Sequence, residues 1–325
     1  MAVSSEIGIR FTPVTQCPAC GGVERCLIGK APAFEIHIQT EVLRHPSYEI
    51  ARCLVCDLCY KTARPSDEQL KHYYVNLLDY RQMAIDGLFP PERHVVNFIK
   101  QNIRSKAALL DFGCSDGRLL SQFTSAHACF GTELNPGAAS IAESKGISIV
   151  TMERIIKDTR LFDFIILSDV FEHLSRPLSL LKQLLLCLRP GGFMIITTGN
   201  AGALGKNIAE SWYFRLFGHL QALTINHTIW LAYQLGLKRV FIKKISHYDS
   251  ALTDRLKQNI RHWLYRQVCP YPNLIGRLFL SIPLLKKKIS RWDELPSLGL
   301  KKDHLVIVYQ KAENNGLKED GSCEF

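Results

Sequence analysis

Two pairs of cysteines near the start of the chain have the spacing of a metal site. Cys17 and Cys20 form one Cys-x2-Cys pair, and Cys53 and Cys56 form the second. Four thiolates from two such pairs can occupy the tetrahedral corners around Zn²⁺. We therefore expect a structural zinc site in a small ribbon of short strands, with unbound thiols as the alternative.

Neighbouring residues leave the exact ligand set open. Cys26 and Cys59 lie close to the pairs, and Cys59 extends the second pair to a third cysteine at the same spacing. Gly21 suits a tight turn after the first pair, whereas Asp57 follows the second. Six of the 11 cysteines fall within residues 17–59, and no secretory signal is visible. We expect reduced thiols in a cytoplasmic protein rather than disulfides.

A second group of residues has the types and spacing of a nucleotide site. The apolar run 107–110 predicts a buried strand, and Asp111 and a turn containing Gly113 and Gly117 follow it. A strand and a small-residue turn place a ligand at the carboxyl end of a doubly wound sheet. Glu133 ends the next strand, where an acid can bind ribose hydroxyls. The Gly-x-Gly-x-x-Gly spacing is absent, which disfavours NAD.

The elements that must position these residues alternate between strands and helices. A helix-like run at 118–123 follows the first turn, and Ser66 is the expected cap of a helix further upstream. The other expected strands are 128–133, 147–150, 162–167, 193–198, 240–245 and 304–309. Further helices are expected to begin at Pro90, Pro136, Pro177 and Thr228. This alternation predicts an α/β, doubly wound sheet.

Five segments between residue 107 and about residue 200 resemble class I S-adenosylmethionine-dependent methyltransferases. They are Leu110-Asp-Phe-Gly-Cys-Ser-Asp-Gly, Gly131-Thr-Glu, Phe162-Asp-Phe-Ile, Asp169-Val-Phe-Glu-His-Leu and Leu188-Arg-Pro-Gly-Gly-Phe. The second glycine of the family's turn is Ser115 here. Together with the cysteine pairs, this layout is similar to a bacterial subgroup of zinc-ribbon methyltransferases associated with polysaccharide, sugar and secondary-metabolite pathways.

The resemblance implies a seven-stranded, Rossmann-like sheet that binds S-adenosylmethionine. It implies that Asp111 orients the cofactor, that Glu133 holds the ribose and that Asp169 lies beside the methionine end. Thr151 and Met152 would flank the adenine. The complete set of cofactor residues expected on this basis is Asp111, Gly113, Cys114, Ser115, Gly117, Glu133, Leu134, Thr151, Met152 and Asp169.

Two histidines are the expected catalytic residues, because a hydroxyl acceptor benefits from a base that titrates near neutral pH. His173 follows the fourth strand of the sheet, and His219 lies in the loop after the fifth, which covers the acceptor in related enzymes. The alternatives are a framework histidine bound to backbone and a histidine that merely packs in the loop. His227 is a weaker third candidate.

The sequence divides into three parts with different charge. We expect a cysteine module and linker helix at 14–80, a methyltransferase domain at 90–311 and a disordered tail at 312–325. The net charge is +10, and residues 236–311 carry 10 Lys and 6 Arg against five acidic residues. Within that range, about 250–302 is expected to form a basic helical insertion before the last strand. It could contact the inner face of an anionic membrane, or form an ordinary capping subdomain.

The expected function is O-methylation of a sugar, a glycan or another small-molecule hydroxyl. One alternative is an rRNA methyltransferase with a zinc module, in which the basic C-terminal part would bind phosphates. Nucleic acid is disfavoured as a partner because the cysteine module is not basic and lacks aromatic residues interleaved with arginine. A second alternative is a non-catalytic protein that kept the cofactor-binding fold.

Overall fold

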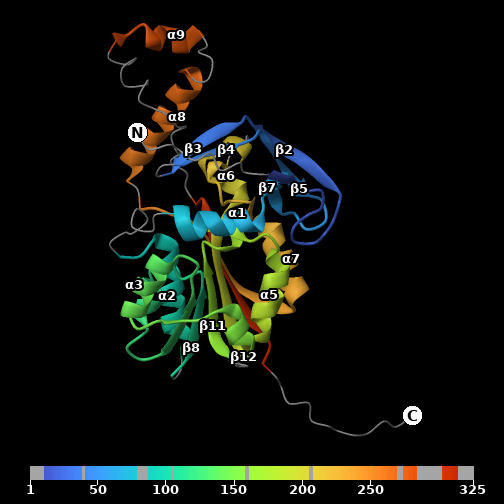
Figure 1. Cartoon of the computed structure of the whole chain (residues 1–325), viewed down its shortest axis with the longest axis vertical. Helices are drawn as coiled ribbons and strands as arrows, with labels where there is room; N and C mark the ends of the chain where they lie inside the picture. Colours follow the sequence, from blue (N-terminus) through green and yellow to red (C-terminus); the bar gives the residue numbers. More distant parts are fainter. Residues whose placement is uncertain are drawn as a thin grey trace, which may run out of the picture.

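The computed structural model describes residues 11–38, 41–78, 87–103, 106–157, 161–204, 208–249, 251–268, 274–283 and 302–313. A seven-stranded sheet in the order β10-β9-β8-β11-β12-β15-β14 lies at its centre (Figure 1). The bounds are β8 (Ala108–Phe112), β9 (Ala128–Thr132), β10 (Ser148–Ile149), β11 (Phe162–Ser168), β12 (Leu188–Gly199), β14 (Leu237–Ile245) and β15 (His304–Lys311). The predicted seven-stranded α/β sheet is confirmed. Within it, β15 is antiparallel to both neighbours, so it begins where β12 and β14 end.

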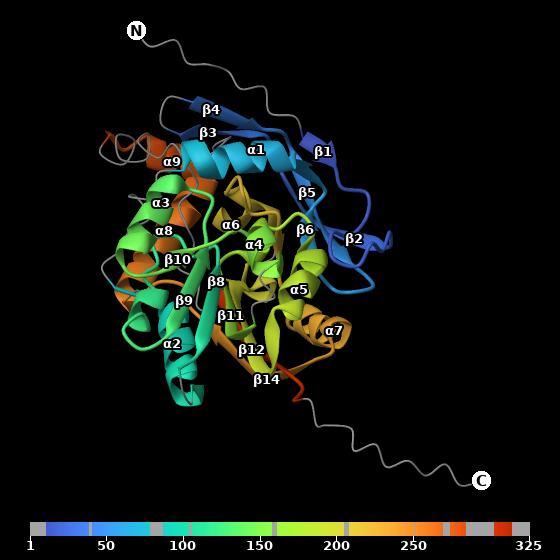
Figure 2. The same ribbon diagram turned by 60° about the horizontal axis from the view of Figure 1, so that its bottom comes forward.

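Helices cover both faces of this sheet, which explains why its strands are apolar throughout. Figure 2 shows α2 and α3 on one side and α5 and α7 on the other. Their bounds are α2 (Pro90–Asn102), α3 (Pro136–Ser144), α5 (Pro177–Leu186) and α7 (Ile225–Leu235). Helix α2 buries Val95, Val96 and Ile99, and α7 ends at Gly236, whose φ of 61° gives the left-handed cap that favours glycine. A short α4 (Met152–Lys157) follows β10.

Two expectations about local structure need correction. The helix expected at 118–123 is wrong, since this segment contains only the 3₁₀ turn η3 (Leu120–Gln122). Only residues 124–127 lie between the segment 118–123 and the start of β9, which leaves no room for a longer helix. Strand β12 also begins earlier than expected, at Leu188. Phe162 pairs with Leu188 and Phe164 with Phe193, so residues 189–192 bulge out between two registers.

The cysteine-rich part forms small sheets beside one end of the main sheet. A four-stranded sheet has the order β13-β6-β5-β2, from β2 (Arg25–Ala31), β5 (Tyr48–Cys53), β6 (Cys59–Lys61) and β13 (Gln221–Ala222). Two-stranded sheets pair β1 (Phe11–Pro13) with β7 (Ala63–Pro65) and β3 (Phe34–Ile38) with β4 (Glu41–His45). Helix α1 (Asp67–His72) follows, capped by Ser66 as expected, and continues into η1 (Tyr73–Leu77). Figure 1 shows α1 between the small sheets and the main sheet.

The segment after β12 connects the two parts of the molecule. It contains η5 (Ala201–Ala203), η6 (Ile208–Glu210), α6 (Trp212–Arg215) and β13. Because β13 pairs with β6, a strand from the larger part completes the sheet of the smaller one. One hydrophobic core joins Leu58 and Tyr60 of the small sheets to Leu110, Leu167 and Leu223.

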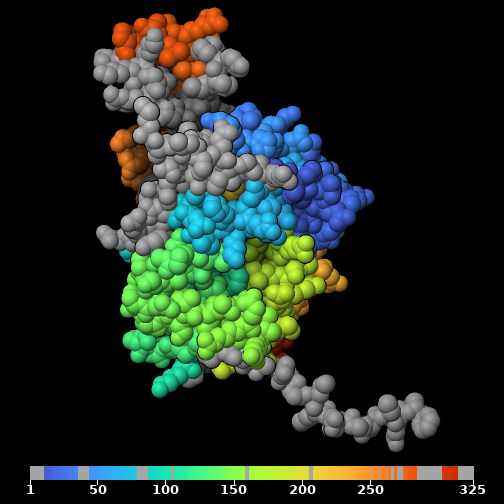
Figure 3. Space-filling model, in the orientation of Figure 1, coloured from blue at the N-terminus to red at the C-terminus, as the bar shows by residue number. Residues whose placement is uncertain are grey.

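An arm of two helices extends from the end of β14. Helices α8 (Leu252–Val268) and α9 (Leu274–Leu280) project away from the main sheet (Figures 1 and 3). Residues 284–301 of the expected insertion, residues 79–80 of the expected module and residues 314–325 of the expected tail lie outside the described residues. None of the described helices is long and apolar enough to cross a membrane.

Candidate functional site

The turn after β8, residues 113–117, lies at the carboxyl edge of the sheet, and we refer to it as the cradle. Gly113, Ser115 and Gly117 have φ angles of 80°, 50° and 74°. The amide of Gly113 donates to the carbonyl oxygen of Thr132 at 2.9 Å, which fastens the turn to the end of β9. A Cβ atom at Gly113 would lie 2.6 Å from Cγ2 of Val170. Glycine is therefore required there by both the backbone angle and the close approach.

Glu133 is held in place at the rim of this cradle. Its Oε2 accepts a hydrogen bond from the amide of Ser115 at 2.9 Å, and its Oε1 accepts one from the amide of Asn135 at 2.7 Å. Each carboxylate oxygen keeps a lone pair for a further donor, such as a ribose hydroxyl. The next residue, Leu134, is 56% exposed, so its side chain is free to pack against an apolar ligand group. Thr151 and Met152 lie at the start of α4, after β10.

Asp111 is buried beneath the cradle with an unsatisfied oxygen. Its Oδ1 has no hydrogen-bond partner among the described groups. Burial, with repulsion from Glu92 and Glu133, raises the pKa of Asp111 to about 8. A buried, unpartnered carboxyl fits a cationic ligand group, whose charge would offset the cost of ionising it. Cys114 differs from the other turn residues, because its thiol packs against Gly131 of β9 and only its backbone lines the turn.

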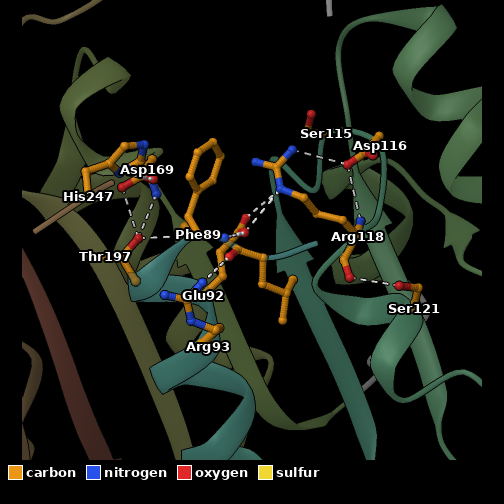
Figure 4. Close-up of polar contacts among 12 residues, drawn as sticks. Phe89, Glu92, Arg93, Ser115, Asp116, Arg118, Ser121, Asp169, Thr197 and His247 are labelled. Carbon is orange, nitrogen blue, oxygen red and sulfur yellow. Dashed lines mark hydrogen bonds and ion pairs between the residues drawn. The ribbon is translucent and has the colours of Figure 1, made fainter. Parts of the chain in front are cut away.

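Three residues that the sequence analysis did not assign to the site fasten α2 to the cradle. Nε of Arg118 donates to Oε1 of Glu92 at 2.9 Å, and its guanidinium lies 4.9 Å from the ring centre of Phe89 (Figure 4). Glu92 also accepts a hydrogen bond from the amide of Phe89 at 2.8 Å, which caps α2. The Pro90-Pro91 start of the helix was visible in the sequence, but the partner of Glu92 was not.

Asp169 follows β11 with a φ of 54°, an unusual angle for a residue other than glycine. Thr197 donates to its Oδ1 at 3.0 Å. His247 Nδ1 lies 3.6 Å from Asp169 Oδ2, and His304 Nε2 lies 3.8 Å from Oδ1. Burial alone would raise the pKa of Asp169, but its interactions with His247 and His304 and the hydrogen bond from Thr197 outweigh burial and lower it. Asp169 therefore remains ionised. Neither histidine was assigned to the site from the sequence.

His173 and His219, the two expected bases, contact each other in a partly buried cluster. Their ring centres lie 4.8 Å apart, and ligand atoms of both lie within 4.8 Å of Glu172. His173 Nδ1 lies 2.8 Å from the Tyr74 hydroxyl and 2.9 Å from the carbonyl oxygen of Gly218. Burial lowers the pKa of both histidines, and that of His219 falls well below its usual value.

The four paired cysteines converge, and their sulfur atoms all lie within 4.8 Å of one another. Sγ of Cys17 lies 3.4 Å from that of Cys56, and Sγ of Cys20 lies 3.5 Å from that of Cys53. Sulfur atoms bound to one tetrahedral Zn²⁺ at about 2.3 Å would have similar spacings. The four thiols therefore fit this ion. Cys26 and Cys59 are not part of this group.

The two turns that carry these cysteines have the same backbone form. The amide of Gly21 donates to the carbonyl oxygen of Cys17 at 2.9 Å, and the amide of Asp57 donates to that of Cys53 at 3.0 Å. Asp57 has a φ of 66° where the first turn has glycine at 73°. Its carboxylate accepts a hydrogen bond from Thr224 at 2.7 Å and pairs with Arg52. These bonds hold an aspartate in the second turn.

His227, the third histidine candidate, lies at this second turn and away from the cradle. Its Nδ1 is 2.8 Å from the carbonyl oxygen of Cys56. Thr224 caps the N-terminus of α7, and His227 lies in the first turn of that helix. The cysteine turns and the region after β12 are thus bonded together.

A comparison with known proteins identifies the part of the chain around the cradle. Residues 86–240 match the family model described as a methyltransferase domain. This part of the chain is therefore similar to methyltransferase domains. The ubiquinone biosynthesis O-methyltransferase of Parvibaculum lavamentivorans is 36% identical in an alignment of 103 residues that covers 28% of this chain. The match spans 40% of that relative's length.

Solved structures with a similar arrangement have low sequence identity to this chain. The YcgJ protein of Bacillus subtilis is 18% identical, covering 68% of this chain and 99% of its own, with a TM-score of 0.46. An S-adenosylmethionine-dependent methyltransferase from Mesorhizobium loti is 12% identical. The match covers 68% of this chain and 98% of that protein, with a TM-score of 0.41. The residues that match the family model include the cradle, Glu133 and Asp169 but end before His247 and His304.

Proposed function

We propose that this protein transfers a methyl group from S-adenosylmethionine to a hydroxyl group of a sugar, a glycan or another small molecule. The observation that carries the proposal is the cradle of the methyltransferase domain, in which an unpartnered, buried Asp111 lies beneath a positive-φ turn and Glu133 stands at its rim. The curated relative is named as an O-methyltransferase, which supports oxygen as the acceptor atom.

The residues of the cradle have separate tasks in this proposal. Glu133 accepts hydrogen bonds from the ribose hydroxyls, and the backbone of the turn passes beneath the methionine part. Asp111 provides negative charge for a cofactor that is cationic. Leu134 and Met152 offer apolar surface to the adenine. S-adenosylmethionine would supply the methyl group, while the protein supplies position and a dry environment.

We further propose that Cys17, Cys20, Cys53 and Cys56 bind a structural Zn²⁺. The support is the convergence of the four sulfur atoms and the matching form of the two turns. A closed set of four thiolates leaves no open position for a substrate. The ion would therefore act on folding and on the position of the segment after β12, with no part in the chemistry.

A third proposal concerns the arm formed by α8 and α9, which would contact an anionic membrane surface. Leu252, Leu256, Ile260 and Trp263 recur at helical spacing on α8, and all four are exposed. Leu274, Ile275 and Leu278 are exposed on α9. The net positive charge of residues 236–311 supports an anionic partner.

Calorimetry with S-adenosylhomocysteine tests the cofactor assignment without knowledge of the acceptor. We expect one binding site per chain, a loss of affinity of about tenfold or more for Glu133→Gln, and no change for Glu143→Gln, an exposed acid on α3. No binding heat for the wild-type protein would refute the proposed function.

Transfer of a tritiated methyl group then separates the acceptor classes. We expect label to enter sugars, glycans or small hydroxyl compounds from a cell extract and to be absent from rRNA. Label in rRNA, together with RNA binding at low salt, would replace the proposal with an RNA methyltransferase. Cofactor binding with no labelled product from any extract fraction would favour a non-catalytic protein.

A further inference from the structure

Three strands of the main sheet bring an acid and two histidines to the same edge. Asp169 follows β11, His247 lies two residues beyond the end of β14, and His304 is the first residue of β15. Strand β15 is antiparallel to its neighbours β12 and β14. Its first residue therefore lies at the edge of the sheet where β12 and β14 end. Ligand atoms of the three residues lie within 4.8 Å of one another.

Two aromatic rings pack against the ring of His247. Phe89 stacks on it with ring centres 4.5 Å apart and planes 29° apart, and His304 lies 4.4 Å away at 35°. Its backbone amide donates to Asp303 Oδ1 at 2.8 Å. Its Nδ1 lies 3.6 Å from Oδ2 of Asp169, within ion-pair distance but without a hydrogen bond, and 12% of the side chain is exposed; Figure 4 shows the two side chains next to each other. The ring is therefore oriented by its surroundings but still accessible to a ligand.

Asp169 is fixed as the partner of this ring. Thr197 donates to Oδ1 of Asp169 at 3.0 Å, and the amide of Asp169 donates to the carbonyl oxygen of Thr197 at the same distance. His304 approaches Asp169 from the other side, and its Nδ1 lies 3.4 Å from Asp303 Oδ1. A carboxylate beside Nδ1 favours the tautomer that carries its proton there and leaves Nε2 as an acceptor.

We propose that His247, oriented by Asp169, is the general base that removes the proton from the acceptor hydroxyl, in place of the expected His173 and His219. This inference rests on the proposed function. In the step, the O–H bond breaks and the proton binds to Nε2 of His247, while the proton on Nδ1 stays beside Asp169. The hydroxyl oxygen would keep the electron pair for its new bond to the methyl carbon, while the carbon–sulfur bond of S-adenosylmethionine would break, leave its electron pair on sulfur and give S-adenosylhomocysteine as the leaving group. The proton then leaves His247 to water, which restores the neutral ring.

The charges around His247 suit this role. Asp169, His304, Asp303 and Arg118 all face it. Burial, aided by His304 and Arg118, lowers the pKa of His247, so its ring is neutral and able to accept a proton at neutral pH. Burial opposes protonation of His304, but Asp303 and Asp169 outweigh it and raise the pKa of that ring. The two acids therefore favour the protonated form of His304.

The two histidines expected from the sequence are less suited to the task. The Nδ1 of His173 is occupied by contacts with Tyr74 and the carbonyl oxygen of Gly218. The pKa of His219 is lowered so far by burial and by neighbouring positive charge that its ring is a weak base.

Acylation with diethyl pyrocarbonate, which modifies accessible, unprotonated imidazoles, tests the state of His247 directly. Peptide mass spectrometry would follow the rate at each histidine, with exposed His72 as the internal reference. At neutral pH we expect His247 to react about tenfold or more faster than buried His304, and Asp169→Asn to slow it about threefold or more. Modification of His173 or His219 with His247 unreactive would overturn the proposal.

Methyl transfer to two phenols gives a second readout. His247→Gln is expected to lose about 10²–10⁴-fold in kcat with phenol but less than about tenfold with 4-nitrophenol, which ionises without a base. Equal losses with both acceptors would refute a role in proton transfer. His219→Gln serves as the comparison and is expected to lose far less with phenol.

Two further measurements distinguish a failed base from a failed cofactor site and from a metal centre. S-adenosylhomocysteine binding to His247→Gln should stay within about threefold of wild type. Absence of binding in the wild type would refute the proposed function itself, whereas normal binding with an inert His247 would refute only the base. Native mass spectrometry that finds a second metal ion, lost in Asp169→Asn, would replace the base with a metal centre.

Discussion

Three residues other than glycine adopt positive φ angles inside the proposed sites. They are Asp57 at the second cysteine turn, Ser115 in the cradle and Asp169 after β11. Such a conformation costs on the order of 1 kcal/mol or more for a residue with a side chain. Each is held by hydrogen bonds to a neighbouring element: Asp57 to Thr224, the amide of Ser115 to Glu133, and Asp169 to Thr197. The sites are thus preorganised at the expense of local strain.

The raised pKa of Asp111 leads to a prediction about ligand binding. In the folded protein its pKa is about 8, whereas an unfolded aspartate titrates near 4. A cationic ligand favours the ionised form, so affinity for S-adenosylmethionine should rise from pH 6 to about pH 8 and then level off. Asp111→Asn should bind about tenfold or more weakly and show little of this pH dependence. Calorimetry across this pH range measures both quantities.

The same titration gives a control on protein stability. Because the folded protein holds the Asp111 proton more tightly than the unfolded chain does, ionisation costs stability as pH rises from about 4 to about 8. The melting temperature of Asp111→Asn relative to wild type should therefore increase over that range and stay constant above it. A difference that does not change with pH would contradict the assigned pKa.

At the scale of secondary-structure elements, the α8–α9 arm differs most from the rest of the chain. Elsewhere, the apolar faces of α2, α5 and α7 pack against the sheet. On α8, Leu256 and Trp263 remain exposed beside exposed Lys257. An exposed apolar stripe of this kind costs solubility unless it has a partner.

The arm predicts binding to anionic lipid vesicles. Phosphatidylcholine vesicles that contain phosphatidylglycerol should bind the protein in a flotation assay, and salt should weaken that binding. Leu256→Glu with Trp263→Glu should reduce binding about tenfold or more, because each removes apolar burial and adds repulsion. The matched control is Leu186→Glu on α5, which is also exposed but lies far along the chain. Similar losses for both variants, or binding to neutral vesicles alone, would contradict the prediction.

At the scale of the whole molecule, the cysteine turns and the methyltransferase domain behave as one packed unit. Strand β13 completes the sheet of the small part, and Gln221 in that strand donates to the carbonyl oxygens of Phe171 and Leu174. Lys61 is fully buried between the parts, and its Nζ donates to the carbonyl oxygen of Leu216 at 3.1 Å. A change at the cysteines should therefore reach the segment between β12 and α7.

Metal removal provides the test at this scale. Cys20→Ser should lose the bound zinc, as measured by elemental analysis, and lower the free energy of unfolding by about 3 kcal/mol or more. The rate of hydrogen exchange at the backbone amides of residues 211–227 should then increase, together with the rate at the cysteine turns. Cys26→Ser, outside the group of four, is the control and should keep both the metal and the protection. Loss of zinc with unchanged exchange at 211–227 would show that the two parts are independent.

Features that depend on neighbouring residues were predictable from the sequence. The paired cysteines, the glycine turn after β8, the cap at Ser66 and the alternation of strands and helices all arise from local spacing and backbone preference. The same reasoning failed at 118–123, where an amphipathic run forms only a 3₁₀ turn. There the short distance to β9 overrides the helical propensity of the residues.

Features that depend on strand order required the tertiary structure. His247 and His304 lie 57 positions apart in the numbering and far from Asp169, with no motif to connect them. They meet because β15 is inserted antiparallel between β12 and β14, which brings its first residue to the ligand edge. Pairing between strands distant in sequence is set by the packing of the whole sheet, and local spacing carries no record of it. The chain's local patterns thus specified the cofactor cradle, whereas the sheet topology decided which histidine faces Asp169.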